Sequence, residues 1–205
     1  SFENLVVNKY GEERVISWRN TVLTGRERRI IGTLSSGEDI TEKKQVEEVI
    51  KESEERYRTT TETAADAIIC MKPPGVIYLW NRKAKEMFGY SADEVIGKDL
   101  HILITPGRYR EKAYEGVKMF FETGTGPMID KTIEIEAIRK DGSEFPVELS
   151  VSGMNIIGNW HAVGIIRDIT ERKNAENSIK KQMDELLRFH KATIQREFMV
   201  KELKD

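Results

Sequence analysis

Residues 141–152 read DGSEFPVELSVS and carry the clearest structural pattern in the chain. The opening Asp-Gly pair is typical of a tight β-hairpin turn, because both residues tolerate the positive φ angles that such a turn requires. After the turn, Val147, Leu149 and Val151 alternate with polar residues. This alternation predicts an antiparallel strand with one face in a core and the other in water.

The pattern extends outward into a sheet with helices inserted in it. Three strands are expected to form a meander, over 129–140, 144–155 and 160–169. Two shorter strands precede them, over 67–71 and 76–80, separated by the turn sequence KPPG. Helices are expected between the two groups of strands, over 82–88, 92–96 and 109–122, the second with a capping box formed by Ser91 and Glu94. An antiparallel sheet with such insertions has an α+β fold.

Part of the sequence occurs twice. The tripeptide Asp-Ile-Thr stands at 39–41 and again at 168–170, and a hairpin glycine precedes each copy, at Gly11 and Gly142. Repeats of this kind indicate repeated structural units. The first copy is expected to contain strands over 2–8, 14–23 and 30–40 and a charged helix over 42–58. It therefore corresponds to the last three strands of the second copy and to the helix that follows them.

Four motifs resemble the PAS family with its C-terminal PAC segment. They are WNRKA at 80–84, FGYSADEVIGK at 88–98, RKDGSEFP at 139–146 and GIIRDITERK at 164–173. The resemblance implies the PAS fold, a five-stranded antiparallel sheet with helices on one face. It divides the chain into the C-terminal strands of a truncated preceding PAS domain at 1–41, a linker helix at 42–63, a complete PAS domain with PAC segment at 64–170, and a coiled-coil-like exit helix at 171–205.

The junction between the last strand and the exit helix is the expected path of a signal. Asp168 is expected to cap the helix, with Glu171 at the third helical position completing a capping box. A junction formed by Asp168, Thr170 and Glu171 joins sheet and helix without a flexible segment, so strain in the sheet would reach the helix. The alternative interpretation is that this motif only ends a strand and begins a helix.

The exit helix has one narrow apolar stripe. Its members are Ile179, Met183, Leu186, His190 and Thr193 or Ile194. Their spacing of four and three residues predicts a coiled-coil seam. Because one helix cannot bury such a stripe alone, we expect a homodimer. The alternative is a truncated helix that frays or packs back on the sheet.

His190 is a candidate phosphoacceptor, because PAS domains often precede the phosphoacceptor helix of histidine kinases. The kinase motif has an acidic residue after the histidine, whereas this chain has Lys191. The sequence also lacks a Gly-rich nucleotide loop. We therefore expect no enzyme activity in this chain. The expected parent is a two-component histidine kinase or phosphorelay protein that supplies the output domain, and a kinase fragment phosphorylated on His190 is the less favoured hypothesis.

Composition narrows the remaining classes of protein. A net charge of -2 over 205 residues argues against a nucleic-acid-binding protein. The chain has neither a run of about 18 apolar residues nor a signal peptide at its start, so we expect a cytoplasmic location without membrane contact. A single cysteine, Cys70, excludes an internal disulfide. The three histidines are far apart, which argues against a metal site.

The sequence predicts no cofactor. In the oxygen-sensing haem proteins that it resembles, an axial histidine and a distal arginine occupy the positions of Ala113 and Ile133 in this chain. The photoadduct flavin proteins of the family need a cysteine on the helix before the long helix, and residues 101–106 contain none. Haem ligation by His101 or Cys70 and a non-covalent flavin remain as alternatives.

A cavity between the sheet and the long helix is implied by the same resemblance. The expected lining residues are Ile69, Tyr109, Ala113, Val117, Phe120, Ile133, Ile135, Val147, Leu149 and Val151. Such an apolar cavity could hold a small aromatic or lipid-like effector, or it could be filled core. We interpret the chain as a regulatory sensor module that relays a cavity or dimer-state signal to the exit helix. The alternative is a ligand-free module for dimerisation or protein interaction.

Overall fold

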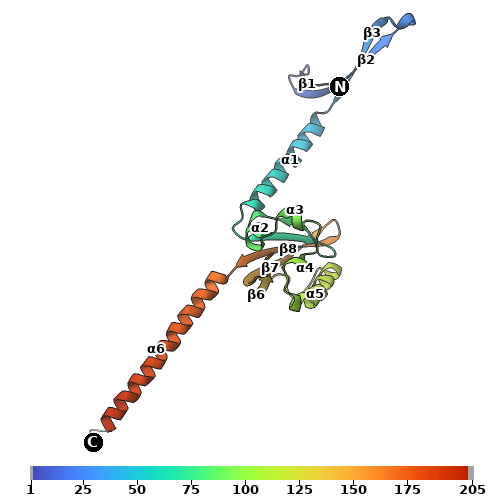
Figure 1. The fold of residues 1–205 in the computed structure, drawn as a ribbon. Coiled ribbons are helices and arrows are strands. Elements are labelled where there is room, and N and C mark those ends of the chain that lie inside the picture. Colours follow the sequence, from blue (N-terminus) through green and yellow to red (C-terminus); the bar gives the residue numbers. More distant parts are fainter. Residues whose placement is uncertain (1, 203–205) are drawn as a thin grey trace. The chain divides into compact units, whose positions relative to one another are not determined.

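The computed structural model describes the backbone of residues 2–202 and the side chains of residues 2–26 and 28–191. The chain forms two compact units, Ser1–Thr60 and Thr61–Asp205. Figure 1 shows a small sheet in the first unit and a larger sheet with helices in the second. A long helix follows each sheet, α1 (Thr41–Glu62) after the first and α6 (Thr170–Glu202) after the second.

The first unit is an antiparallel meander with the strand order β1-β2-β3. Its elements are β1 (Phe2–Val7), β2 (Glu13–Thr24), a 3-10 turn η1 (Arg26–Arg28) and β3 (Ile30–Asp39). The three expected strands are thus confirmed to within one residue at each end. Helix α1 runs four residues beyond the expected end at residue 58 and buries none of its side chains.

The second unit is built on a five-stranded antiparallel sheet with the order β5-β4-β8-β7-β6. Its strands are β4 (Ala67–Lys72), β5 (Val76–Trp80), β6 (Lys131–Ile138), β7 (Glu144–Ile156) and β8 (Asn159–Asp168). The hairpin expected at 141–142 joins β6 to β7, with Gly142 at a φ of 86°. The predicted α+β fold with a five-stranded antiparallel sheet is confirmed.

Helices fill the connection between β5 and β6. They are α2 (Arg82–Phe88), α3 (Ala92–Val95), α4 (Leu100–Ile104), a 3-10 turn η2 (Gly107–Tyr109) and α5 (Arg110–Thr123). The capping box of Ser91 and Glu94 at the start of α3 is confirmed. Helix α4 was not among the helices predicted from spacing and caps, although the comparison with flavin proteins placed residues 101–106 on a helix before the long one. The Asp99 carboxylate caps it by accepting bonds from the backbone N–H groups of His101 and Ile102.

The core lies between these helices and one face of the sheet. The strand register places Ile69, Val147 and Ile166 on this face, where they pack with Phe88 and Val95 of the helices. All five side chains are buried. The helices therefore cover the inner face of the sheet, as the PAS fold requires.

Asn81 is the one polar side chain in the core of the described residues. Its amide oxygen accepts bonds from the backbone N–H groups of Ile68 and Ala84, and its amide nitrogen donates to the carbonyl oxygens of Thr61 and Asp66. A buried polar group costs little when its bonds are satisfied. Asn81 thereby fixes the start of α2 to β4 and to the segment that precedes β4.

Candidate functional site

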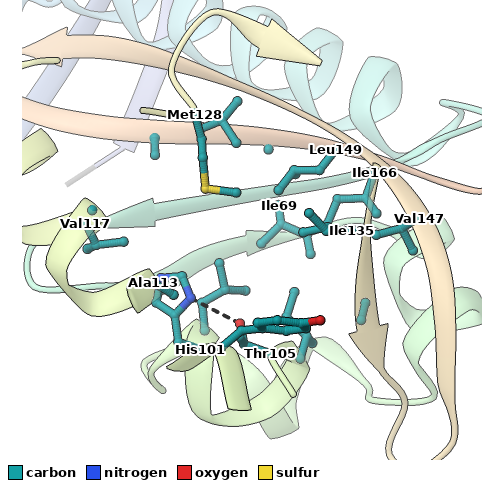
Figure 2. Close-up of a pocket in the computed structure, with 18 of the residues that line it drawn as sticks. Ile69, His101, Thr105, Ala113, Val117, Met128, Ile135, Val147, Leu149 and Ile166 are labelled. Atoms are coloured by element: carbon teal, nitrogen blue, oxygen red, sulfur yellow. Dashed lines mark hydrogen bonds between the residues drawn. The ribbon is translucent and has the colours of Figure 1, made fainter. Parts of the chain in front are cut away.

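A cavity of about 730 Å³ lies between the sheet and helices α4 and α5. Figure 2 shows side chains from the sheet on one side of it and from the helices on the other. Nine of the ten residues expected around the cavity line it, namely Ile69, Tyr109, Ala113, Val117, Phe120, Ile135, Val147, Leu149 and Val151. A volume in this range is typical of sites for small organic molecules.

Ile133 is the expected lining residue that the structure leaves out of the cavity wall. The expected strand over 129–140 begins only at Lys131, because Asp130 has a positive φ of 56° and interrupts it. The turn before Asp130 places Met128 and Ile129 in the wall instead, and Ile129 forms a bridge to Val151. Ile133 is half-buried nearby and pairs with Leu149 in the sheet.

Helix α4 contributes a part of the wall that the sequence reasoning missed. His101 and Thr105 line the cavity, and His101 Nδ1 lies 3.2 Å from the Thr105 hydroxyl (Figure 2). Burial lowers the pKa of His101, and the nearby Asp99 only partly opposes this effect, so the imidazole is neutral at neutral pH. The signal available in the sequence was an N-cap residue followed by apolar residues at helical spacing, Asp99 before Leu100, Leu103 and Ile104.

Charged residues at the edge of the cavity are paired with one another. Arg108 of η2 donates to Glu136 at 2.5 Å and to both carboxylate oxygens of Glu144 at 2.7 and 2.6 Å. The hydrogen bond from Arg108 lowers the pKa of Glu144. These bonds attach η2, and with it Tyr109 of the cavity wall, to strands β6 and β7.

The Asp168 carboxylate connects the end of β8 to the start of α6. One oxygen accepts the Thr170 N–H at 2.8 Å and the Thr170 hydroxyl at 2.5 Å, and the other accepts Arg139 at 2.7 Å. Burial raises the pKa of Asp168, but the bonds from Thr170 and Arg139 outweigh it and leave the pKa below its ordinary value. The expected capping geometry needs correction, because Asp168 is the last residue of β8 and its carboxylate binds Thr170, whereas Glu171 was the expected partner.

Arg139 extends this junction into the core. Its guanidinium also donates to the carbonyl oxygen of Met87 at the end of α2 and stacks over the Phe145 ring at 3.5 Å from the centroid. One side chain therefore contacts α2, the β6–β7 hairpin and the last residue of β8.

The first turn of α6 is also attached to the sheet by ion pairs. Glu134 of β6 and Glu148 of β7 are cross-strand partners, a like-charged pair that is unfavourable by itself. Arg172 bridges them, at 2.7 Å from Glu134 and 3.3 Å from Glu148, and Lys173 binds Glu134 as well. The bond from Lys173 lowers the pKa of Glu134.

The same junction occurs in the first unit. Asp39 accepts the N–H and the hydroxyl of Thr41 at 3.0 and 2.6 Å, and these bonds lower its pKa. Lys44 of α1 binds Glu3 of β1 at 2.8 Å, which reproduces the Lys173–Glu134 pair at equivalent positions. The two copies of the sequence repeat thus fold into the same meander and the same strand-to-helix junction.

The remaining candidates lie apart from the cavity. His190 is exposed on α6, and Cys70 of β4 is buried with 2% of its surface exposed. No group of three or more His, Cys, Asp or Glu side chains suited to a metal ion occurs among the described residues. In the apolar stripe, Ile179, Met183 and Leu186 are exposed to 66%, 56% and 63%. The side chains of 193–194 lie outside the described residues.

No helix in the described part of the chain is long and apolar enough to cross a lipid bilayer.

Comparisons with known proteins agree with the fold. The family model for the PAS domain matches residues 65–171. The chain is 31% identical over 150 residues to the sensor protein FixL of Bradyrhizobium diazoefficiens, a match that covers 73% of this chain and 29% of FixL. It is 34% identical over 127 residues to the two-component system protein A of Emericella nidulans, covering 60% of this chain and 18% of that protein.

A solved structure shows the same fold. The PAS domain of an HTR-like protein from Haloarcula marismortui aligns with a TM-score of 0.50 and 24% identity, covering 62% of this chain and 99% of that domain. The chain spans less than a third of the two curated relatives named above. The family match extends from the start of β4 into the first turn of α6 and includes more than half of the 205 residues. The chain belongs to the PAS domain family.

Proposed function

We propose that this chain is the regulatory PAS sensor module of a larger signalling protein, with a histidine kinase of two-component type as the favoured parent. PAS domains are sensory and non-catalytic, and the relatives include sensor proteins. The module relays the state of its cavity to the exit helix α6, which leads to the output domain. It does so without haem or a flavin photoadduct, because the resemblance aligns Ala113 with the axial histidine of the haem proteins and residues 101–106 contain no cysteine.

The observation that supports this relay is the double attachment of α6 to the sheet. Asp168 binds Thr170 and Arg139, and Arg172 binds Glu134 and Glu148. The strands that carry these contacts, β6, β7 and β8, also supply the cavity wall through residues such as Ile135, Val147 and Ile166. A shift of the wall is therefore transmitted to the first turn of α6 through directly bonded groups.

The output step requires that α6 change its packing against a second copy. The exposed stripe of Ile179, Met183 and Leu186 supports a homodimer through α6, because an isolated helix leaves this surface in water. A change at residues 170–173 would then alter the alignment of the two helices. The alternative function, a ligand-free dimerisation module, uses the same stripe but needs no coupling between cavity and helix.

The test perturbs the cavity wall and measures amide hydrogen exchange over residues 171–180 of the 205-residue chain. Ala113→Leu enlarges a side chain of the wall, and Glu115→Leu is the matched control on the exposed side of α5. We expect Ala113→Leu to change exchange in α6 and Glu115→Leu to leave it unchanged. In an Asp168→Ala, Arg172→Gln background the effect of Ala113→Leu should disappear. Equal exchange in the native and Ala113→Leu chains would overturn the relay and favour the dimerisation module.

A further inference from the structure

The cavity owes its volume to small residues that face one another across the core. Ala113 and Gly116 of α5 line one wall, and Ala162 and Gly164 of β8 line the opposite wall. A Cβ atom built on Gly116 or Gly164 would meet its neighbours only at ordinary contact distances of 3.7 Å or more. A methyl group would therefore fit at either glycine without a clash, and the sequence leaves that space free.

The interior of the cavity offers no charge to a ligand. The deep wall consists of aliphatic and aromatic side chains such as Ile69, Phe120 and Leu149. His101 has its Nδ1 against Thr105, and its buried Nε2 has no hydrogen-bond partner within the described part of the chain. Burial lowers the pKa of this imidazole, which keeps it uncharged. A charged group brought inside would lose its hydration without gaining a partner.

The charged residues of the lining are at the edge, and the acidic ones already have partners. Glu136 binds Arg108, and Glu134 binds Lys173 and Arg172. Lys112 of α5 is exposed at the same edge. An anionic ligand could reach Lys112 only with its head group outside the apolar wall, and it would face the two glutamates there.

We infer that the cavity is a binding site for an uncharged, largely apolar organic molecule, held by shape and apolar contact. This inference rests on the proposed function, because it names the class of effector that the sensor cavity would hold. The cavity volume of about 730 Å³ accommodates a molecule of ten or so carbon atoms with room to spare. Binding would draw the walls together and move β7 and β8, the strands joined to α6.

The test uses two probes with the same chain and different head groups, decan-1-ol and decanoate. Binding to the 205-residue chain is measured by calorimetry and by native mass spectrometry at neutral pH. We expect one decan-1-ol per chain and an affinity for decanoate that is lower by at least about tenfold, since the carboxylate must be desolvated or left outside. Equal or tighter binding of decanoate, weakened by Lys112→Ala, would show a site for anions and overturn the inference.

Two substitutions on α5 test whether decan-1-ol binds inside the cavity. Ala113→Leu should lower the affinity for decan-1-ol by about tenfold or more, because the added side chain occupies the site, while the thermal midpoint stays equal or rises as the void is filled. Glu115→Leu, on the exposed side of α5, should bind as the native chain does. Unchanged binding in Ala113→Leu would place the probe elsewhere and overturn the inference.

The inference and the proposed function fail in different ways. Arg139 lies outside the cavity wall, so the Arg139→Gln variant should still bind one decan-1-ol even though its junction at Asp168 is weakened. If decan-1-ol does not bind the native chain, the inference is wrong, whereas the relay is judged separately by hydrogen exchange in α6. If decan-1-ol binds and exchange in α6 does not respond, the inference stands and the relay is wrong.

Discussion

Replacing Asp168 by alanine should release the start of α6 from the sheet and destabilise the second unit. The carboxylate accepts bonds from Arg139 at 2.7 Å and from the N–H and hydroxyl of Thr170 at 2.8 and 2.5 Å. A hydrogen bond contributes about 1 kcal/mol net to the free energy of unfolding, and more when a charge is involved. The Arg139 and Asp168 side chains are 28% and 32% exposed, so solvent screens their attraction. We therefore expect a loss of about 2 kcal/mol.

The assay is urea unfolding of the 205-residue chain followed by tryptophan fluorescence. A Trp18→Phe background leaves Trp80 and Trp160, which both lie in the second unit, as the reporters. Asp168→Ala, Arg139→Gln and the double variant form a thermodynamic cycle. Because the two residues are in direct contact, their coupling energy should be about 1 kcal/mol. The m-value should stay unchanged, since the same surface is exposed on unfolding.

A control variant and the pH dependence decide whether the reasoning holds. Asp141→Ala removes similar bonds to Ser143 at an exposed turn and should cost less than about 1 kcal/mol. The folded pKa of Asp168 is below its ordinary value of 3.8, so its contribution is complete above that pH and is lost as the pH falls through the folded pKa. The difference between native and Asp168→Ala chains should therefore shrink in acid. A cost below about 0.5 kcal/mol at neutral pH, or one that persists in acid, would show that the Asp168 carboxylate does not hold the start of α6 to the sheet.

Three further outcomes follow from single contacts. The hydrogen bond from Lys140 lowers the pKa of Glu94 to about 2, so an NMR titration should show that value. The substitution Lys140→Gln should raise the pKa of Glu94, and an unchanged pKa in this variant would contradict the pairing. Gly124→Ala should destabilise the second unit by at least about 2 kcal/mol in urea unfolding, since Gly124 has a φ of 73° and an added Cβ would collide with the Trp160 indole. Leu186→Lys should convert the proposed dimer into a monomer in native mass spectrometry, because it charges the apolar stripe of α6, and a monomeric native chain would remove the dimer from the proposal.

Most of the sheet was predictable from the sequence, because strands with one buried and one solvent-exposed face have alternating apolar and polar residues. Alternation at Val147, Leu149 and Val151 indicated both the strand and its inner face, and the Asp-Gly pair indicated the turn before it, in which Gly142 has a positive φ. The helix cap at the start of α3 could also be predicted from a short stretch of sequence. Ser91 and Glu94 form their box because both partners lie within one turn, so no knowledge of the rest of the fold was needed.

Two features were not predicted from the sequence. Helix α4 has only five residues, Leu100–Ile104, so its cap at Asp99 and its apolar spacing are weak signals among many apolar neighbours. The wall position given to Ile133 assumed a regular strand from residue 129, and the positive φ of Asp130 interrupts it.

The cavity volume depends on small residues from two elements, α5 and β8, that are far apart in the sequence. Ala113 and Gly116 are unremarkable on a helix, and Gly164 is unremarkable in a strand. The fold brings these small residues from α5 and β8 into the wall of one cavity. The resemblance to a family with such a cavity pointed to the right elements, but only the facing of α5 and β8 gives the volume.

The strand-to-helix junction occurs in both units, so its formation does not depend on the cavity of the second unit. In the first unit, the register pairs Ile16 with Asp39 as it pairs Val147 with Asp168 in the second, and the Thr41 hydroxyl also accepts the N–H of Val15 at 2.8 Å. Pro146, which occupies the position equivalent to Val15, has no N–H to give. The described part of the first unit places no helices between its strands other than η1. The joint between sheet and helix is therefore a local property of the Asp-Ile-Thr motif and its lysine–glutamate pair. The relay proposed above therefore needs, besides this joint, the cavity wall that α4 and α5 form with the sheet of the second unit.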